Sequence, residues 1–318
     1  MIGMNLGLMI LMGALLFTGC SAFKKPEELR VGILSWPGYE PLALADSLNY
    51  YDEKIKIIRF PSVIDVLGAM RNGTIDVAAL TIDESMVYAQ ENPEIRAFLI
   101  CDISNGGDGI VAKEGITIPA QLKGKRIAAE ESALSSYVLN RFLKASGLGL
   151  SDITIVPVNY DIQLQTFSSD QADAVVTYNP VKDQLIAQGG KLLFDSSKMP
   201  GEIVDVLIAR DSVLKEKKIS VTLLINGWFK SLEYMSKNAK DANKRMAYFE
   251  GVSEELFTHS LEGIKIPTRE ESLKMLTKGT GSIHETSIPL IQNMRTQGLL
   301  REDASFENFF TSEYIGMK

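Results

Sequence analysis

Apolar and polar positions over residues 29–90 follow two alternating periods. Short runs rich in Val, Ile and Leu have the length of strands, and the stretches between them carry apolar residues at helical spacing, such as Leu42, Ala45 and Leu48. Ser62 precedes one such helix and Asn72-Gly73 follows it, as is typical of helix caps. The pattern predicts strand–helix repeats and a parallel sheet covered by helices, with strands at 29–34, 55–60 and 75–80.

The middle of the chain repeats this pattern. Strand-like runs alternate with amphipathic segments, which we interpret as a second α/β lobe. The predicted strands are 125–129, 153–158, 173–177 and 191–194, and the predicted helices are 132–146, 162–167 and 181–187.

A polar stretch rich in glycine and carboxylates separates the two halves. Residues 101–113 have the sequence CDISNGGDGIVAK, with strand-like runs on both sides of the polar residues. Such a loop weakens a fold unless its flexible backbone and its carboxylates are needed. We predict that the chain crosses here between two lobes, beside a ligand; the alternative is a surface hairpin loop. The apolar run 201–210 would carry the chain back.

The chain beyond residue 210 is predicted to be mostly helical. Trp228 and Met246 belong to apolar stripes at helical spacing, which we assign to the core, and Thr268 opens a capping box with Glu271. The predicted domains are a signal peptide (1–19), a tether (20–28), lobe I (29–105 and 205–318) and lobe II (106–204).

The chain begins with one long apolar run, residues 1–17, followed by Thr18-Gly19-Cys20. Its length suits a signal peptide, and LLFTGC looks like a bacterial lipobox, which predicts cleavage before Cys20 and more than one acyl chain on that residue. Two features depart from the motif, since no Lys or Arg precedes the run and Phe17 stands where Leu is usual. The alternative is an uncleaved anchor, and both predict an exported, membrane-tethered protein.

Composition excludes some classes of partner. The 318 residues carry a net charge of −7, with 45% hydrophobic and 23% charged residues, which suits about two globular domains. An acidic chain without a dense Lys/Arg patch argues against a nucleic-acid partner. Cys101 is the second of two cysteines, so we expect no disulfide within the mature chain and a buried Cys101.

Several motifs, in their order, resemble one family. They are WPGYEP after the first strand, RNGTIDVAAL, SNGGDGIVAK at the crossover, LKGKRIAAEESALSSYVL, and ADAVVTYNP followed by GGKLLFDSS. From residue 28 onward the chain resembles the nitrate/sulfonate/taurine branch of ABC-transporter substrate-binding proteins, a family that also includes pyrimidine-precursor binding proteins. The resemblance implies a type II periplasmic-binding-protein fold: two α/β lobes, each a mixed but mostly parallel sheet flanked by helices, with the ligand in the cleft between them.

In open α/β sheets, ligands bind beyond the carboxyl ends of the strands. The loops in that position supply aromatic rings, hydroxyls, amides and carboxylates, a mixture that suits a small polar solute, although each aromatic ring serves equally well in lobe packing. The candidate ligand-binding residues are Ser35, Trp36, Tyr39, Thr81, Asp83, Asn105, Asp108, Glu130, Ser135, Tyr137, Tyr160, Tyr178 and Asn179.

Charge narrows the predicted ligand. The cleft loops carry no Arg or Lys but several carboxylates, and an anion buried among carboxylates is costly. We therefore expect an amine-, amidine- or pyrimidine-like ligand or a zwitterion, with sulfonate, taurine or nitrate as the alternative, held by amides at a helix N-terminus such as 132–136. The opposing interpretation is that most of these acids cap helices or face solvent, as expected for Asp83 and Glu131.

An enzyme is not expected. Both histidines, His259 and His284, fall in the C-terminal helical part, away from the cleft loops, and no His or Cys spacing suits a metal. We predict no cofactor, a monomer, and delivery of ligand to an ABC permease. The alternative partner is a membrane signalling receptor, for which the protein would act as a sensor subunit.

Overall fold

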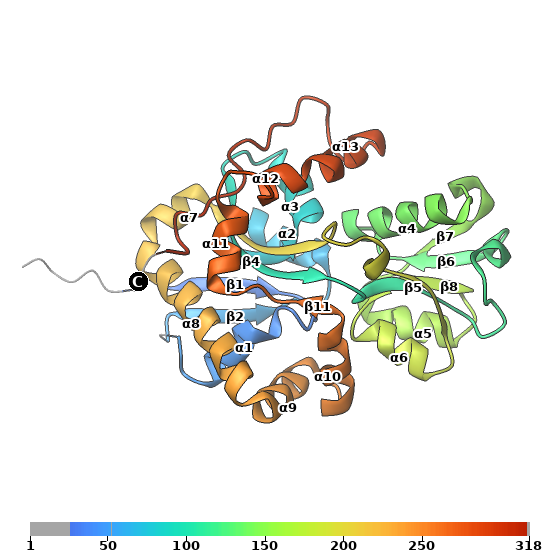
Figure 1. Cartoon of the computed structure of the whole chain (residues 1–318), viewed down its shortest axis with the longest axis horizontal. Coiled ribbons are helices and arrows are strands. Elements are labelled where there is room, and N and C mark those ends of the chain that lie inside the picture. The colour runs from blue at the N-terminus through green and yellow to red at the C-terminus, as the bar shows by residue number, and fades with distance from the viewer. Residues whose placement is uncertain (1–25, 52, 317–318) are drawn as a thin grey trace, which may run out of the picture.

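The computed structural model describes residues 26–51 and 53–316, which form two sheets lying side by side (Figure 1). In the six-stranded sheet, β1 is parallel to β2 and β3, whereas β10 is antiparallel to β3 and β4. Its order is β11 (Ile264–Lys265), β4 (Ile95–Ser104), β10 (Val204–Arg210), β3 (Val77–Thr81), β1 (Leu29–Ile33) and β2 (Ile55–Arg59).

In the five-stranded sheet, β6 is parallel to β7 and β8, and β5 is antiparallel to β8 and β9. Its order is β7 (Thr154–Pro157), β6 (Arg126–Ala129), β8 (Ala174–Tyr178), β5 (Asp108–Ala112) and β9 (Lys191–Asp195). We call the six-stranded sheet with its helices lobe I and the five-stranded sheet with its helices lobe II; the exact domain boundaries stay a prediction.

Helices cover both sheets. In lobe II, α4 lies on one face and α5 and α6 on the other, and in lobe I, α1 packs against α8 and α9 (Figure 1). The lobe II helices are α4 (Ala133–Ser146), α5 (Gln163–Ser168) and α6 (Val181–Ala187). The lobe I helices are α1 (Glu40–Ser47), α2 (Val63–Arg71), α3 (Ile82–Ala89), α7 (Asp211–Glu216), α8 (Lys218–Lys237), α9 (Ala239–Glu250), α10 (Glu254–Glu262), α11 (Arg269–Leu276), α12 (Ile283–Thr286) and α13 (Ile288–Thr296).

Local capping signals mark two helix starts correctly. Ser62 caps α2, with its hydroxyl 3.2 Å from the Asp65 backbone nitrogen, and Thr268 forms the predicted capping box with Glu271. The cap predicted for Asp83 is wrong. Thr81 occupies the cap position of α3, and Asp83 lies in the first turn, buried at 3% exposure.

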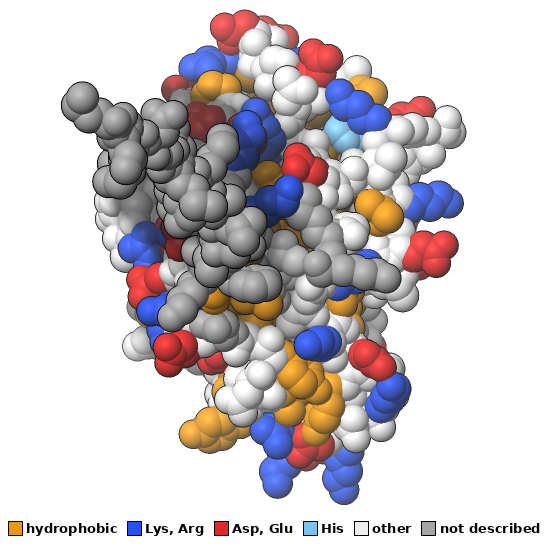
Figure 2. Space-filling model, turned by 90° about the vertical axis from the view of Figure 1, so that its left-hand side faces the viewer, with side chains coloured by type: hydrophobic (Ala, Val, Ile, Leu, Met, Phe, Trp, Pro, Cys, Tyr) orange, Lys and Arg blue, Asp and Glu red, His pale blue; other side chains and the backbone are white. Residues whose placement is uncertain are grey.

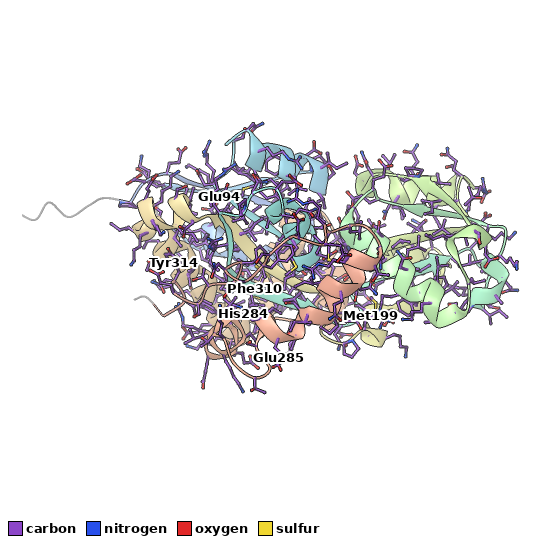
Figure 3. The ribbon with its side chains drawn as sticks, turned by 90° about the horizontal axis from the view of Figure 1, so that it is seen from above. Glu94, Met199, His284, Glu285, Phe310 and Tyr314 are labelled. Carbon is purple, nitrogen blue, oxygen red and sulfur yellow. The ribbon has the colours of Figure 1, made fainter. Side chains whose placement is uncertain are left out.

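Two connections join the lobes, from β4 to β5 and from β9 to β10, as the polar stretch 101–113 and the run 201–210 predicted. The connections also touch each other, since the Ser104 and Ser196 hydroxyls lie 2.7 Å apart. Gly107 is required for close approach, because a Cβ there would lie 2.5 Å from the Trp36 ring. Figure 3 shows Met199 of the second connection beside lobe II.

The predicted core positions are buried. Trp228 and Met246 are fully buried, and so is the free thiol Cys101. His284 packs against the Phe310 ring with 5.1 Å between centroids, in the C-terminal segment of lobe I (Figure 3). At the end of lobe I, acidic and basic side chains are interspersed over the visible surface (Figure 2).

The predicted signal peptide, the lipidation site Cys20 and most of the tether lie outside the described residues. Within residues 26–51 and 53–316, the helices are too short or too polar to cross a bilayer.

Candidate functional site

A narrow cavity of about 20 Å³, enough for roughly one water molecule, lies between the lobes. It sits where β1 and β3 end in lobe I and where β5 begins and β8 ends in lobe II, so both lobes supply its wall. The lining residues are Leu34, Trp36, Tyr39, Val63, Thr81, Glu84, Asp108, Leu134, Tyr178 and Asp205.

Three aromatic rings form a fixed wall of this cavity. Trp36 meets Tyr178 edge to face, with centroids 5.8 Å apart, and Tyr178 stacks on Tyr160 with centroids 4.1 Å apart. The Trp36 indole Nε1 donates to Asp102 at 3.0 Å, and the Tyr39 hydroxyl donates to Asp205. These hydrogen bonds use the polar groups of Trp36 and Tyr39, so both rings present mainly apolar surface to a ligand.

The WPGYEP motif explains how Trp36 comes so close to Asp102. A Cβ on Gly38 would lie 1.8 Å from Asp102 Oδ2 and 2.6 Å from Trp36 Nε1. Only glycine therefore allows the loop between β1 and α1 to lie on this carboxylate.

Buried carboxyl groups surround the rest of the cavity. Burial, in each case the largest cause, raises the pKa of Asp102, Asp108 and Glu130 to about 7 and that of Asp83 to about 6. Burial likewise raises the pKa values of Glu84 and Asp205 well above their usual range. Burial, helped by repulsion from neighbouring carboxyl groups, therefore leaves Asp102, Asp108 and Glu130 partly protonated near neutral pH.

The nearest basic side chain is already neutralised. Lys182 interacts electrostatically with Asp108, yet its Nζ lies 3.0 Å from Asp183 and donates to the Gly106 carbonyl at 2.8 Å. The cavity wall itself contains no Lys, Arg or His among the described residues.

Around the cavity, buried hydrogen-bond acceptors and donors differ in whether they have a partner. Several buried oxygens have no hydrogen-bond partner within the described part of the chain: Asp83 Oδ2, Glu84 Oε1, Asp102 Oδ1, Asp108 Oδ2 and Glu130 Oε1. Two nearby backbone donors, in contrast, are used. The first N–H of α2, on Val63, is bound by the Glu130 carboxylate, and the Ser135 N–H is bound by Ser132 at 3.1 Å. When ionised, these carboxyl oxygens only accept, so they then favour a ligand that brings donors and positive charge.

A metal ion is a poorer fit. No group of three or more His, Cys, Asp or Glu in the described part of the chain is arranged to hold a metal. The carboxyl groups therefore face the cavity as separate acceptors.

The structure brings together part of the predicted set. Trp36, Tyr39, Thr81, Asp108 and Tyr178 line the cavity. Asp83, Glu130, Ser135 and Tyr160 lie behind this wall, next to lining residues or stacked on them.

The other four predicted residues do not reach the cavity. Asn105 is exposed, Tyr137 donates to Glu202 at 2.6 Å, and the Asn179 amide donates to the Ser260 carbonyl at 3.3 Å. Ser35 lies beside Glu250. These four residues therefore lie outside the cavity wall, and their contact with a ligand stays a prediction.

Two carboxyl groups of the wall were missing from the predicted set. Glu84 follows the candidate Asp83 in the first turn of α3, and Asp205 is an isolated acid in the apolar run of β10. A lone carboxylate within a run of buried apolar residues is a signal that points to such a position.

Proteins of known function and structure resemble this chain. The chain is 21% identical to the taurine-binding periplasmic protein of Escherichia coli K12 over 327 residues, covering 96% of this chain and 97% of that protein. A zinc-bound ligand-binding component of an ABC-type import system from Staphylococcus aureus superposes with a TM-score of 0.76 at 16% identity, covering 91% of this chain and 98% of that one.

The fold alone does not separate binding from catalysis. The desulfurization enzyme DSZB also superposes, with a TM-score of 0.69 at 15% identity over 91% of this chain and 97% of that one. These structures confirm the two-lobed periplasmic-binding-protein fold. The profile of the family described as NMT1/THI5 like matches residues 36–242. Because this match covers more than half of the sequence, the chain belongs to the NMT1/THI5-like family, which confirms its resemblance to the substrate-binding proteins of ABC transporters.

Proposed function

We propose that this protein is an extracytoplasmic solute-binding protein that captures a small cationic or zwitterionic molecule between its lobes and delivers it to an ABC importer. The observation that carries the proposal is the interlobe cavity, which is lined by buried carboxyl groups with oxygens that lack partners within the described residues. Amine-, amidine- and pyrimidine-like solutes fit that demand.

Charge supports a cation over a simple anion. Glu84, Asp108 and Asp205 line the cavity, and each interacts electrostatically with other buried carboxyl groups. A cation lowers this repulsion, whereas a nitrate or a sulfonate without an amine raises it. Taurine is a zwitterion, so a taurine-like solute would place its ammonium group among the carboxylates.

Closure of the lobes supplies the mechanism. A ligand in this cavity touches both lobes, so it binds the closed form more tightly and shifts the population toward it. Several interlobe contacts are present in this structure; among them, Glu130 binds the Val63 N–H, and Asn140 of α4 donates to Gln297 at 3.0 Å.

The types of side chain that line the cavity favour binding over catalysis. No His, Cys or Lys of the described chain lines the cavity, so the wall lacks the base and nucleophile pairs of acyl-transfer enzymes. The proposal also includes export, acylation of Cys20, a monomeric state and an ABC permease as the partner. The names of the taurine-binding and ABC import relatives support the export and the permease. A membrane receptor is the second candidate partner, because it would receive the same closed form.

A thermal-shift screen tests the ligand class. The full-length chain in mild detergent is heated with amines, guanidines, pyrimidines and zwitterionic amino acids, and separately with nitrate and alkanesulfonates. A ligand at about 1,000 times its Kd stabilises the native state by about 4 kcal/mol, which raises Tm by several degrees. We expect shifts only with cations or zwitterions. Shifts confined to nitrate or alkanesulfonates would overturn the charge assignment.

A further inference from the structure

We propose that the site recognises a primary ammonium group, which donates its N–H groups to Thr81, Glu84 and Asp108 across the two lobes. This inference rests on the proposed function and specifies the head group of its ligand. The three side chains line the same cavity at 4%, 3% and 2% exposure.

The acceptors converge from three elements. Thr81 ends β3, and Glu84 follows in the first turn of α3, so one strand–helix junction of lobe I carries both. Asp108 begins β5 of lobe II, where it pairs with Tyr178 of β8. A head group held by all three therefore links the lobes directly.

The number and distribution of free acceptors suit an ammonium group. Glu84 Oε1 and Asp108 Oδ2, on two lining residues, have no partner in the described chain. The hydroxyl of a third lining residue, Thr81, is a donor to the Glu84 carboxyl and keeps its lone pairs as acceptors for a ligand. A primary ammonium has three N–H groups that diverge from one nitrogen, and its charge is compact. A guanidinium is planar and binds best to both oxygens of one carboxylate, a different arrangement.

The aromatic wall does not provide the alternative site for a quaternary ammonium. Such a cation has no N–H and binds over ring faces. One face of Tyr178 is stacked on Tyr160, and Trp36 meets Tyr178 at an interplanar angle of 79°. A trimethylammonium head would donate no hydrogen bond to the three oxygens, which is costly for buried acceptors.

Matched ligand series test the head group on the full-length chain in detergent. One series is ethanolamine, dimethylethanolamine and choline; the other is taurine, trimethyltaurine and isethionate, which has no nitrogen; guanidine is added separately. In at least one series we expect the primary ammonium compound to bind about tenfold or more tightly than its trimethyl analogue by calorimetry. Choline or trimethyltaurine binding as well as the primary amine would overturn the proposal, as would binding of guanidine alone or of no primary amine.

These outcomes separate the two proposals. Isethionate binding as tightly as taurine would show that the site recognises the sulfonate, and the proposed cationic ligand would fail as well. Tighter binding of guanidine or of a quaternary cation would agree with the proposed cationic ligand and would contradict only the proposed primary ammonium head group.

Isosteric variants identify the acceptors. Glu84→Gln and Asp108→Asn should each weaken binding of the best primary amine by about tenfold or more and reduce its preference over the trimethyl analogue. Glu131→Gln is the matched control, because Glu131 is exposed and adjacent to the site. If both isosteric variants keep wild-type affinity and selectivity while remaining folded, the assignment of these residues is wrong.

Discussion

Asp102 and Asp205 are cross-strand partners on β4 and β10, the two strands that enter and leave lobe II. Each carboxyl group holds one ring of the same loop, Asp102 through the Trp36 indole and Asp205 through the Tyr39 hydroxyl. The strands that connect the lobes therefore also fix the aromatic wall of the cavity. A change in how these strands pair would move the wall.

Gly38→Ala should disrupt this arrangement. The added Cβ would lie 1.8 Å from Asp102 Oδ2, so the loop must retreat and the Trp36 hydrogen bond must break. The lost hydrogen bond should lower the free energy of unfolding by roughly 0.5–3 kcal/mol, and ligand affinity should fall because the aromatic wall moves. Trp36 fluorescence and calorimetric Kd values measure both effects.

Gly68→Ala is the control for that experiment. Gly68 lies within α2 with no atom within 4 Å of an added Cβ. Alanine there should raise stability by about 0.5–1 kcal/mol and leave affinity unchanged. If Gly38→Ala binds the ligand as tightly as Gly68→Ala does, Gly38 does not contribute to ligand binding.

Asp108→Asn should stabilise the ligand-free protein at high pH. Burial raises the pKa of Asp108 from 3.8 to about 7, so the folded state binds more protons than the unfolded state between these values. Stability contributed by this group is therefore present below pH 4 and is lost as pH rises toward 7. The variant should exceed the wild type by roughly 1–4 kcal/mol at pH 8 and differ little at pH 4.

Denaturant titrations at both pH values measure this difference. Other acids make stability rise with pH, and this contribution cancels when the variant is compared with the wild type. Asp76 is one of them, because hydrogen bonds from Arg30 and Lys217 lower its pKa even though it is partly buried. A variant that is equally destabilised at pH 4 and pH 8 would mean that Asp108 is ionised and favourably paired in the folded protein.

Ligand affinity should rise with pH. Cation binding favours ionised carboxylates, so groups with a raised pKa, such as Asp108, release protons when the ligand binds. Kd should fall by up to about tenfold per pH unit from pH 5 to 7 and level off above, while an amine with a pKa of about 10 stays charged. Calorimetry in buffers of different ionisation enthalpy counts the protons; proton uptake would indicate an anionic ligand instead.

The sequence predicted what local patterns control. The Ser62 cap and the Thr268 capping box depend on residues three positions away, and both form as predicted. The crossover at 101–113 was equally visible, because glycines and carboxylates interrupt an apolar strand pattern. These features require no knowledge of distant contacts.

The site itself was only partly visible. Asp205 enters the cavity because β10 inserts between β3 and β4, and that pairing joins residues about a hundred or more positions apart. Tyr137 and Asn179 lie in the expected loops or helix start, but Glu202 and the Ser260 carbonyl turn their polar groups elsewhere. Loop position was predictable from the strand pattern, whereas side-chain direction depends on tertiary partners.

Glu130→Gln should favour the closed form of the ligand-free protein at pH 8. Glu130 of lobe II binds the Val63 N–H, the first of α2, but burial still raises its pKa to about 7. At pH 8 the carboxylate is therefore ionised, and the ionised form is less stable in this buried place than in solvent. A neutral amide of the same size removes that cost. Hydrogen exchange at Val63 should slow and the radius of gyration should decrease, whereas Glu131→Gln, which changes an exposed neighbour, should alter neither. Identical exchange in the two variants would contradict this prediction.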